Sequence, residues 1–123
     1  QDLPRRAKYG QGLLEDAARV KEPDRALIEK AVQEAQKHIR ALVQSHFINA
    51  IAFIGEEGVT IPCLAGYPTV TVPYGADNEG YPLGATFFAM AGQDEFLMNL
   101  AYAFEQGTNL RMIPEKYLQN EQR

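Results

Sequence analysis

The spacing of apolar positions divides the chain into a helical first part, a strand-rich middle and a closing helix. In residues 23–45 apolar side chains recur every three or four positions, which is the period of one helix face: Leu27, Ile28, Ala31, Val32, Ala35, Ile39, Leu42 and Val43. A shorter helix is predicted over residues 12–20 and is stopped by Pro23, because proline disfavours helix at the residue before it. Pro23 suits the first turn of the longer helix, with Asp24 near the positive end of the helix dipole.

Three segments of the middle region have the composition of β-strands. Residues 47–54 are rich in Ile and Phe and predict a buried strand, whereas residues 69–72 are all β-branched and predict a strand that ends sharply at Pro73. Residues 83–89 predict a third strand. The Gly, Asp, Asn and Pro residues between positions 74 and 82 are typical of turns, so the second and third strands are expected to form a hairpin.

The helical period returns after Asp94 and places five apolar residues on one face: Phe96, Leu97, Leu100, Ala101 and Phe104. A helix is therefore predicted over residues 94–107, with Gly107 as its C-terminal cap. Residues 111–123 are polar and predict a tail.

This order of elements predicts one domain spanning residues 1–123, because 123 residues fit a single core and are too few for two. Residues 1–46 would be helical and residues 47–89 strand-rich. The predicted fold class is α/β, or α+β for the chain taken alone, with helices packed on a small mixed β-sheet.

The distribution of charge argues against a nucleic-acid partner. The net charge is −4, and no Lys or Arg occurs between Arg40 and Arg111. Nucleic-acid binding requires clustered cations that neutralise several phosphates. No apolar run approaches the roughly 18 to 20 residues that span a bilayer, and the first residues lack the apolar core of a signal peptide. The single cysteine cannot form an internal disulfide and is expected to be a reduced thiol. These features together predict a cytoplasmic protein without a membrane or nucleic-acid partner.

The inventory of reactive side chains contains no catalytic constellation. Ser45 is the only serine, so any serine nucleophile would have to be this residue. Cys63 lies in an apolar stretch with no base nearby and is expected to be a buried structural thiol. His38 and His46 have no Cys or carboxylate at metal-ligand spacing and are expected at the surface or in an interface. We therefore predict no catalytic residue, no metal and no cofactor within this chain.

One segment is not explained by composition alone. In residues 65–75, two prolines and two glycines bracket four strand residues. Gly66 and Pro68 would hold a rigid loop ahead of the strand, and loops held by a rigid scaffold are where binding pockets form.

This segment, Ala-Gly-Tyr-Pro-Thr-Val-Thr-Val-Pro-Tyr-Gly in residues 65–75, resembles the C-terminal part of amidase signature enzymes. Glu-Gly-Tyr-Pro-Leu-Gly in residues 79–84 and the closing helix of residues 94–106 extend the resemblance. Weaker agreement runs back through the long helix, so most of the chain is covered. The resemblance implies that the chain is part of the larger amidase signature fold, with residues 47–89 adding strands to a large sheet.

The resemblance also implies a function and a division of labour. The family hydrolyses carboxamide bonds with a serine nucleophile, a second serine in a cis peptide and a lysine base, all from a region N-terminal to the matching part. This chain has one serine and no lysine between Lys37 and Lys116, so the triad would lie outside it. The implied partners are the N-terminal catalytic part of the enzyme and, in the intact enzyme, a small amide substrate.

If the fold follows the family, the loop of residues 64–68 approaches the active-site side. The resemblance therefore implies four candidate residues of the substrate-pocket wall: Ala65, Gly66, Tyr67 and Pro68. The alternative for these residues is a loop that only packs. The chain departs from the common family pattern at Tyr81, at Ala85-Thr86 and at Ala89-Met90, which leaves the substrate amide open, as well as the choice between a hydrolase and an ammonia-supplying component of an amidotransferase.

A different class of function is a free-standing binding or assembly module that reuses this scaffold without hydrolase activity. If the chain is a fragment, its strands evolved to pair with strands that are absent from it, which leaves strand edges open. Residues 47–54 and 83–90 carry no charge that would protect an open strand edge, so self-association of the isolated chain is expected.

Overall fold

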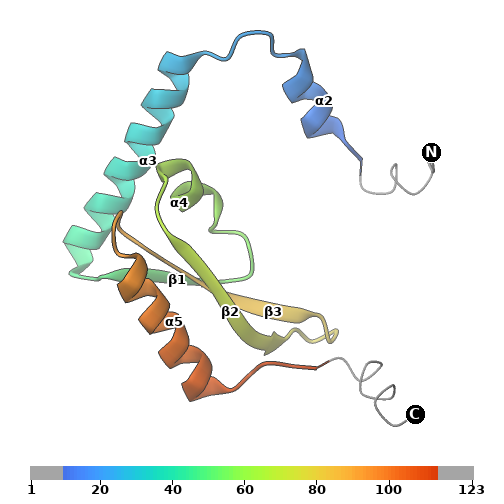
Figure 1. The fold of residues 1–123 in the computed structure, drawn as a ribbon, viewed down its shortest axis with the longest axis vertical. Coiled ribbons are helices and arrows are strands. Elements are labelled where there is room, and N and C mark those ends of the chain that lie inside the picture. Colours follow the sequence, from blue (N-terminus) through green and yellow to red (C-terminus); the bar gives the residue numbers. More distant parts are fainter. Residues whose placement is uncertain (1–9, 114–123) are drawn as a thin grey trace.

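The computed structural model describes residues 10–113 and contains helices packed on a three-stranded antiparallel sheet (Figure 1). Its elements are α2 (Gly12–Arg19), α3 (Arg25–His46), β1 (Ala50–Ile54), α4 (Thr60–Ala65), β2 (Thr69–Ala76), β3 (Pro82–Ala89) and α5 (Asp94–Thr108). The predicted fold class is confirmed. The predicted tail lies outside the described residues from position 114 onward.

Helix α3 is fixed at both ends by backbone geometry. Its N-cap is Asp24, whose carboxylate accepts a hydrogen bond from the Leu27 N–H at 3.0 Å and so satisfies one free donor of the first turn. Pro23 precedes this cap, so its predicted place inside the first turn is wrong. The helix ends at Phe47, which has a left-handed φ of 53° and donates its N–H to the Val43 carbonyl. The predicted strand start at residue 47 is therefore wrong as well, because the chain leaves the helix before β1 begins at Ala50.

The six-residue helix α4 follows β1 and was not expected from the sequence. Six residues are too few to show a helical period, and its apolar residues suggested only a buried stretch. Gly66 ends the helix with a φ of 71°, a conformation that glycine adopts without strain. Cys63 is exposed on this helix, so the prediction of a buried thiol is wrong.

The strand order is β1-β3-β2, and both pairings are antiparallel. The predicted hairpin between the second and third strands is confirmed, and the Asp77 carboxylate closes its turn by accepting the N–H groups of Glu79 and Tyr81. However, β2 continues to Ala76 through Pro73, with a register shift between Pro73 and Gly75. Proline is tolerated there because β2 is an edge strand. The predicted strand end at Pro73 is therefore wrong.

Two apolar clusters lie on opposite faces of the sheet, because successive strand residues point to opposite sides. One cluster joins β2 and β3 to α5: Val72, Ala85, Phe87, Ala89, Leu97 and Ala101. The other joins β3 to α3 and the end of α4: Ala35, Ile39, Ala65, Tyr67 and Phe88. The neighbours Phe87 and Phe88 thus belong to different cores. Helix α5 continues past Gly107 to Thr108 and is capped by Asn109 in the left-handed region, which corrects the predicted glycine cap.

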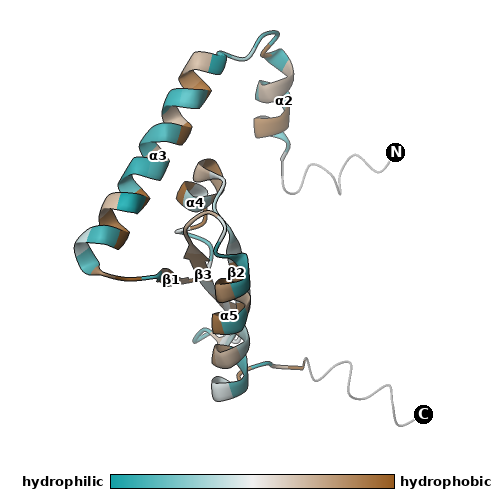
Figure 2. Ribbon diagram, turned by 60° about the vertical axis from the view of Figure 1, so that its left-hand side comes forward, coloured by the Kyte–Doolittle hydropathy of each residue, from teal (hydrophilic) through white to brown (hydrophobic). Residues whose placement is uncertain are grey.

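Much of the apolar stripe of α3 is not covered by the described residues. Of its members only Ala35 and Ile39 are buried, whereas Leu27 and Ile28 are 63% and 50% exposed. The N-terminal half of α3 extends past α4 toward α2, and α2 buries none of its residues (Figures 1 and 2). This surface is typical of a helix that packs against further elements.

Candidate functional site

The four candidate pocket-wall residues are the last residue of α4, Ala65, and the connection of residues 66–68 that leads to β2. Ala65 and Tyr67 are buried, Pro68 is half-buried, and Gly66 is exposed with open space where a Cβ would lie. The loop is therefore accessible at Gly66 and Pro68, while Ala65 and Tyr67 belong to the buried cluster beside α3.

Three hydrogen bonds hold this loop to different elements. The Tyr67 N–H donates to the Pro62 carbonyl at 2.9 Å, and the Ala89 N–H donates to the Pro68 carbonyl at 3.3 Å. The Gln36 side-chain amide donates to the Ala65 carbonyl at 3.0 Å. The loop is thus tied to α4, β3 and α3 at once, as expected of a rigid loop.

Gln36 is a site residue that the sequence did not single out. It lies among several polar residues on the exposed face of α3, and nothing in their spacing distinguishes it from Gln33. Only the packing of α4 against α3 brings the Ala65 carbonyl within reach of its amide. A helix glutamine acquires such a role through tertiary contact, so no local signal marks it.

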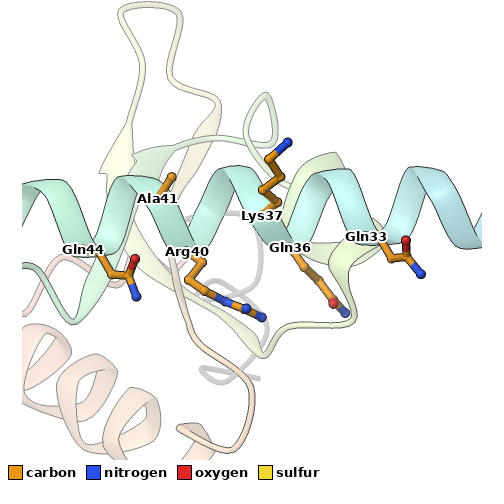
Figure 3. A pocket seen from close by; sticks show the side chains of 6 residues that line it. All are labelled: Gln33, Gln36, Lys37, Arg40, Ala41 and Gln44. Carbon is orange, nitrogen blue, oxygen red and sulfur yellow. The ribbon is translucent and has the colours of Figure 1, made fainter.

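Gln36 also belongs to a shallow polar hollow along α3 (Figure 3), lined by Gln33, Gln36, Lys37, Arg40, Ala41 and Gln44. The side chains of Gln33, Gln36, Arg40 and Gln44 point to the same side of the helix, and Lys37 points to the other. The Lys37 ammonium lies 3.6 Å from the Glu34 carboxylate. One helix face without a second wall does not enclose a small molecule, so this hollow is a surface feature and its Gln36 serves the loop.

A hydroxyl network crosses the sheet. The hydroxyl oxygens of Thr71 and Thr86 lie 2.8 Å apart, and the Thr86 hydroxyl is 3.2 Å from the Gly55 carbonyl oxygen that it donates to. Thr86 is only 3% exposed, so these contacts replace the water that its hydroxyl loses. The network joins β2, β3 and the end of β1.

Replacing Thr86 by valine is expected to lower the free energy of unfolding by about 1–2 kcal/mol, because the change preserves shape but leaves the Gly55 carbonyl without this donor. Thr71→Val is the matched control, with an expected loss below about 1 kcal/mol, since Thr86 then keeps Gly55. Urea denaturation followed by circular dichroism measures both values. Equal losses would contradict a role for the Gly55 contact.

The structure does not assemble the reactive side chains into a catalytic group among the described residues. The Ser45 hydroxyl donates to the Leu42 carbonyl of its own helix at 3.1 Å. The His38 ring lies 3.7 Å from the Glu34 carboxylate at the surface. Within residues 10–113 no group of three or more His, Cys, Asp or Glu residues could hold a metal ion. The helices of this same range include none long and apolar enough to cross a membrane.

Comparison with known proteins gives a consistent picture. No family model matches the chain. It is 29% identical over 94 residues to a probable amidase of Arabidopsis thaliana, and 33% identical over 94 residues to a glutamyl-tRNA(Gln) amidotransferase component of Pelagibacter ubique. These matches cover 76% and 67% of this chain but only 18% and 19% of the relatives. The chain thus spans about a fifth of the length of these relatives.

Solved structures extend the similarity to the fold. The crystal structure of an amidase family protein from Bacillus anthracis strain Ames has a TM-score of 0.78 at 32% identity, over 92% of this chain and 23% of that protein. The native peptide amidase of Stenotrophomonas maltophilia has a TM-score of 0.75 at 28% identity, over 88% of this chain and 26% of that one. By its fold and by these matches, the chain is similar to a portion of an amidase. The relatives are amidases and amidase-signature proteins of which this chain matches about a quarter or less, which is consistent with the C-terminal portion of an amidase signature enzyme that the motif resemblance predicted.

Proposed function

We propose that this chain is the non-catalytic C-terminal part of an amidase that hydrolyses carboxamide bonds with a Ser-Ser-Lys triad located outside it. The chain contributes strands to the enzyme's sheet and, through Ala65, Gly66, Tyr67 and Pro68, part of the substrate-pocket wall. Its partner is the N-terminal catalytic part, and the substrate of the intact enzyme is a small amide.

The match to the Bacillus anthracis protein carries this proposal. Nearly the whole of this chain superimposes on less than a quarter of that amidase family protein, so a longer fold of this kind has ample chain outside the matched part for a triad. The single serine and the missing central lysines support the same division. The rigid attachment of the loop to three elements supports its role as a wall.

The isolated chain is expected to hydrolyse no simple amide or ester above background, because a nucleophile needs an adjacent base and Ser45 has only a backbone partner. Ammonia release from a panel of small carboxamides measures this activity, and Ser45→Ala and Cys63→Ser are the controls. Turnover that persists in both variants would contradict the proposal, because the chain would then hold another nucleophile.

A hybrid tests the positive half of the proposal. In it, this chain replaces the matched quarter of the Bacillus anthracis amidase family protein. If that protein hydrolyses an amide and the hybrid folds, the hybrid is expected to retain this activity. A folded hybrid without activity would favour a free-standing binding or assembly module that only shares the scaffold.

The Gly66→Asn substitution in the active hybrid tests the pocket wall. Asparagine tolerates the left-handed φ at this position better than other residues, and its side chain would enter the open space beside the loop. We expect the KM for the amide to rise about tenfold with little change in stability. Gly80→Asn is the matched control, since Gly80 also has a positive φ and open space but lies in the hairpin turn. Equal KM values for both variants would show that the loop only packs.

A further inference from the structure

The sheet ends in two edge strands that differ in their capacity to accept another strand. The order β1-β3-β2 leaves one side of β1 and one side of β2 without a strand among the described residues. An open edge presents a row of backbone donors and acceptors that can pair with a further strand. The residues and the geometry of each edge strand decide which edge can pair with a further strand.

The backbone groups on the free side of β1 can be assigned from the register. The Gly55 N–H donates to the Gly84 carbonyl at 2.8 Å, next to the pair Ile54 and Ala85. In an antiparallel ladder, residues alternate between facing their partner and facing away. Ile51 and Phe53 therefore direct their N–H and C=O groups toward β3, whereas the intervening Ala50, Ala52 and Ile54 direct theirs to the free side. This row has no proline, glycine or charged residue.

The free side of β2 is less suited to pairing. The Ala89 N–H donates to the Pro68 carbonyl, so by the same alternation Thr69, Thr71 and Pro73 face away from β3. Pro73 has no N–H, and the register shift after it bends the strand. Proline and bulges are common means by which natural edge strands avoid pairing. The β2 edge is protected, and the β1 edge is not.

Apolar surface accompanies the free edge of β1. Helix α5 packs on β2 and β3, and Ile54, on the same face of the sheet as α5, is 44% exposed. On the opposite face, an apolar hollow of about 430 Å³ adjoins β1 and is lined by residues that include Ile39, Leu42, Ile51, Phe53, Ile61 and Phe88. A strand placed beside β1 would bring side chains over both surfaces.

Phe47, three residues before β1, provides an independent indication. It is 95% exposed and has a φ of 53°, a position at a helix end where glycine or asparagine is usual. A bulky residue in this conformation is strained, and strain of this kind persists when the surrounding structure maintains it. The described residues leave the Phe47 side chain uncovered, which points to a partner at this end of β1.

We propose that the remaining amidase chain joins this portion at β1, by adding a strand to the free edge and packing apolar side chains into the hollow beside it. The proposal rests on the proposed function. The argument for this occupant is that the same fold occurs at TM-scores of 0.78 and 0.75 inside amidases of which it covers only 23% and 26%. In those proteins three quarters of the polypeptide is available to cover what is exposed here.

Hydrogen exchange of the backbone amides tests the proposal, read at single residues by fragment-ion mass spectrometry. In the isolated chain, at a dilution where it is monomeric, the outward amides of Ala52 and Ile54 should exchange fast. In the hybrid they should exchange at least about tenfold more slowly, while the Thr71 amide on the β2 edge is unchanged. No gain at Ala52 and Ile54, or a gain at Thr71 alone, would overturn the proposal. Protection that rises with concentration in the isolated chain, without a gain in the hybrid, would also overturn it by assigning the edge to a second copy.

If the hybrid does not fold, co-purification of two separate chains tests the proposal instead. The tagged chain is co-expressed with the Bacillus anthracis protein lacking its matched part, and co-purification is measured. Ala52→Pro removes an outward N–H and should abolish co-purification, whereas Thr69→Pro, at an outward position of β2, should not. Equal retention of both variants, or failure of the unaltered chain to co-purify, would overturn the proposal. Because neither readout is amide hydrolysis, an inactive hybrid with a protected β1 edge would contradict the proposed function and leave the junction supported.

Discussion

Replacing Leu97 by alanine is expected to lower the free energy of unfolding by about 2–5 kcal/mol, because the substitution removes a fully buried side chain and leaves a cavity. Leu97 lies on α5 in contact with the cluster formed by β2 and β3, and is 2% exposed. Since small domains have a free energy of unfolding of only about 5–15 kcal/mol, this single change would remove a large part of the domain's stability. Urea denaturation followed by circular dichroism measures the loss.

The neighbouring Met98 is the matched control for this prediction. It lies one position further along the same helix but is 61% exposed, so Met98→Ala should change the free energy of unfolding by no more than about 0.5 kcal/mol. A loss below about 1 kcal/mol for Leu97→Ala would mean that α5 does not pack on this face of the sheet in solution. Similar losses for both variants would lead to the same conclusion.

The second large effect is self-association of the isolated chain, which we expect to be a dimer or larger at tens of micromolar. Residues 47–54 and 83–90 both lack the charge that protects an open edge, but β3 is central in the sheet and its residues 85–88 pair with β1 on one side and β2 on the other. The β1 edge therefore remains the exposed apolar strand. Exposed Phe47 adds apolar surface just before β1, and exposed Leu13 and Leu27 add more on α2 and at the start of α3. Surface of this kind promotes association in water.

Light scattering on the eluting peak of a size-exclusion column measures the mass. Ala52→Lys, which places a charge beside the free edge of β1, should shift the equilibrium toward monomer. Thr69→Lys on the other edge is the control and should not. A monomeric unaltered chain that binds no dye for exposed apolar surface would show that the chain closes its own core, and would favour the free-standing module.

Helices and strands with a clear local signal were predictable. The apolar stripe of α3 has the helical period over more than five turns, and the β-branched residues 69–72 strongly favour a strand. Both elements are present near their predicted positions. The boundaries were less predictable. Phe47 is apolar and β-prone, yet it caps a helix, because the end of α3 is set by where the chain must turn toward the sheet.

The candidate site, too, has features that were predictable from the sequence and features that were not. The Gly and Pro residues of positions 65–68 indicated a rigid loop, and the loop is held by hydrogen bonds to three elements. The residues that hold it were not predictable, since Gln36 is 29 positions away in sequence from its partner Ala65. Cys63 looked buried because its neighbours are apolar, but a short helix turns it outward.

The sequence by itself indicated the resemblance to amidases, the main helices and strands, and the lack of a second serine and of a central lysine, because these depend on residue identity and short-range spacing. Only the tertiary structure decided which strand is central, which edge is protected and which face each phenylalanine covers. A strand's composition reports that it pairs but not with which neighbour or on which side. The order β1-β3-β2 follows from long-range packing, and this order leaves β1 open while Pro73 and the bulge protect β2.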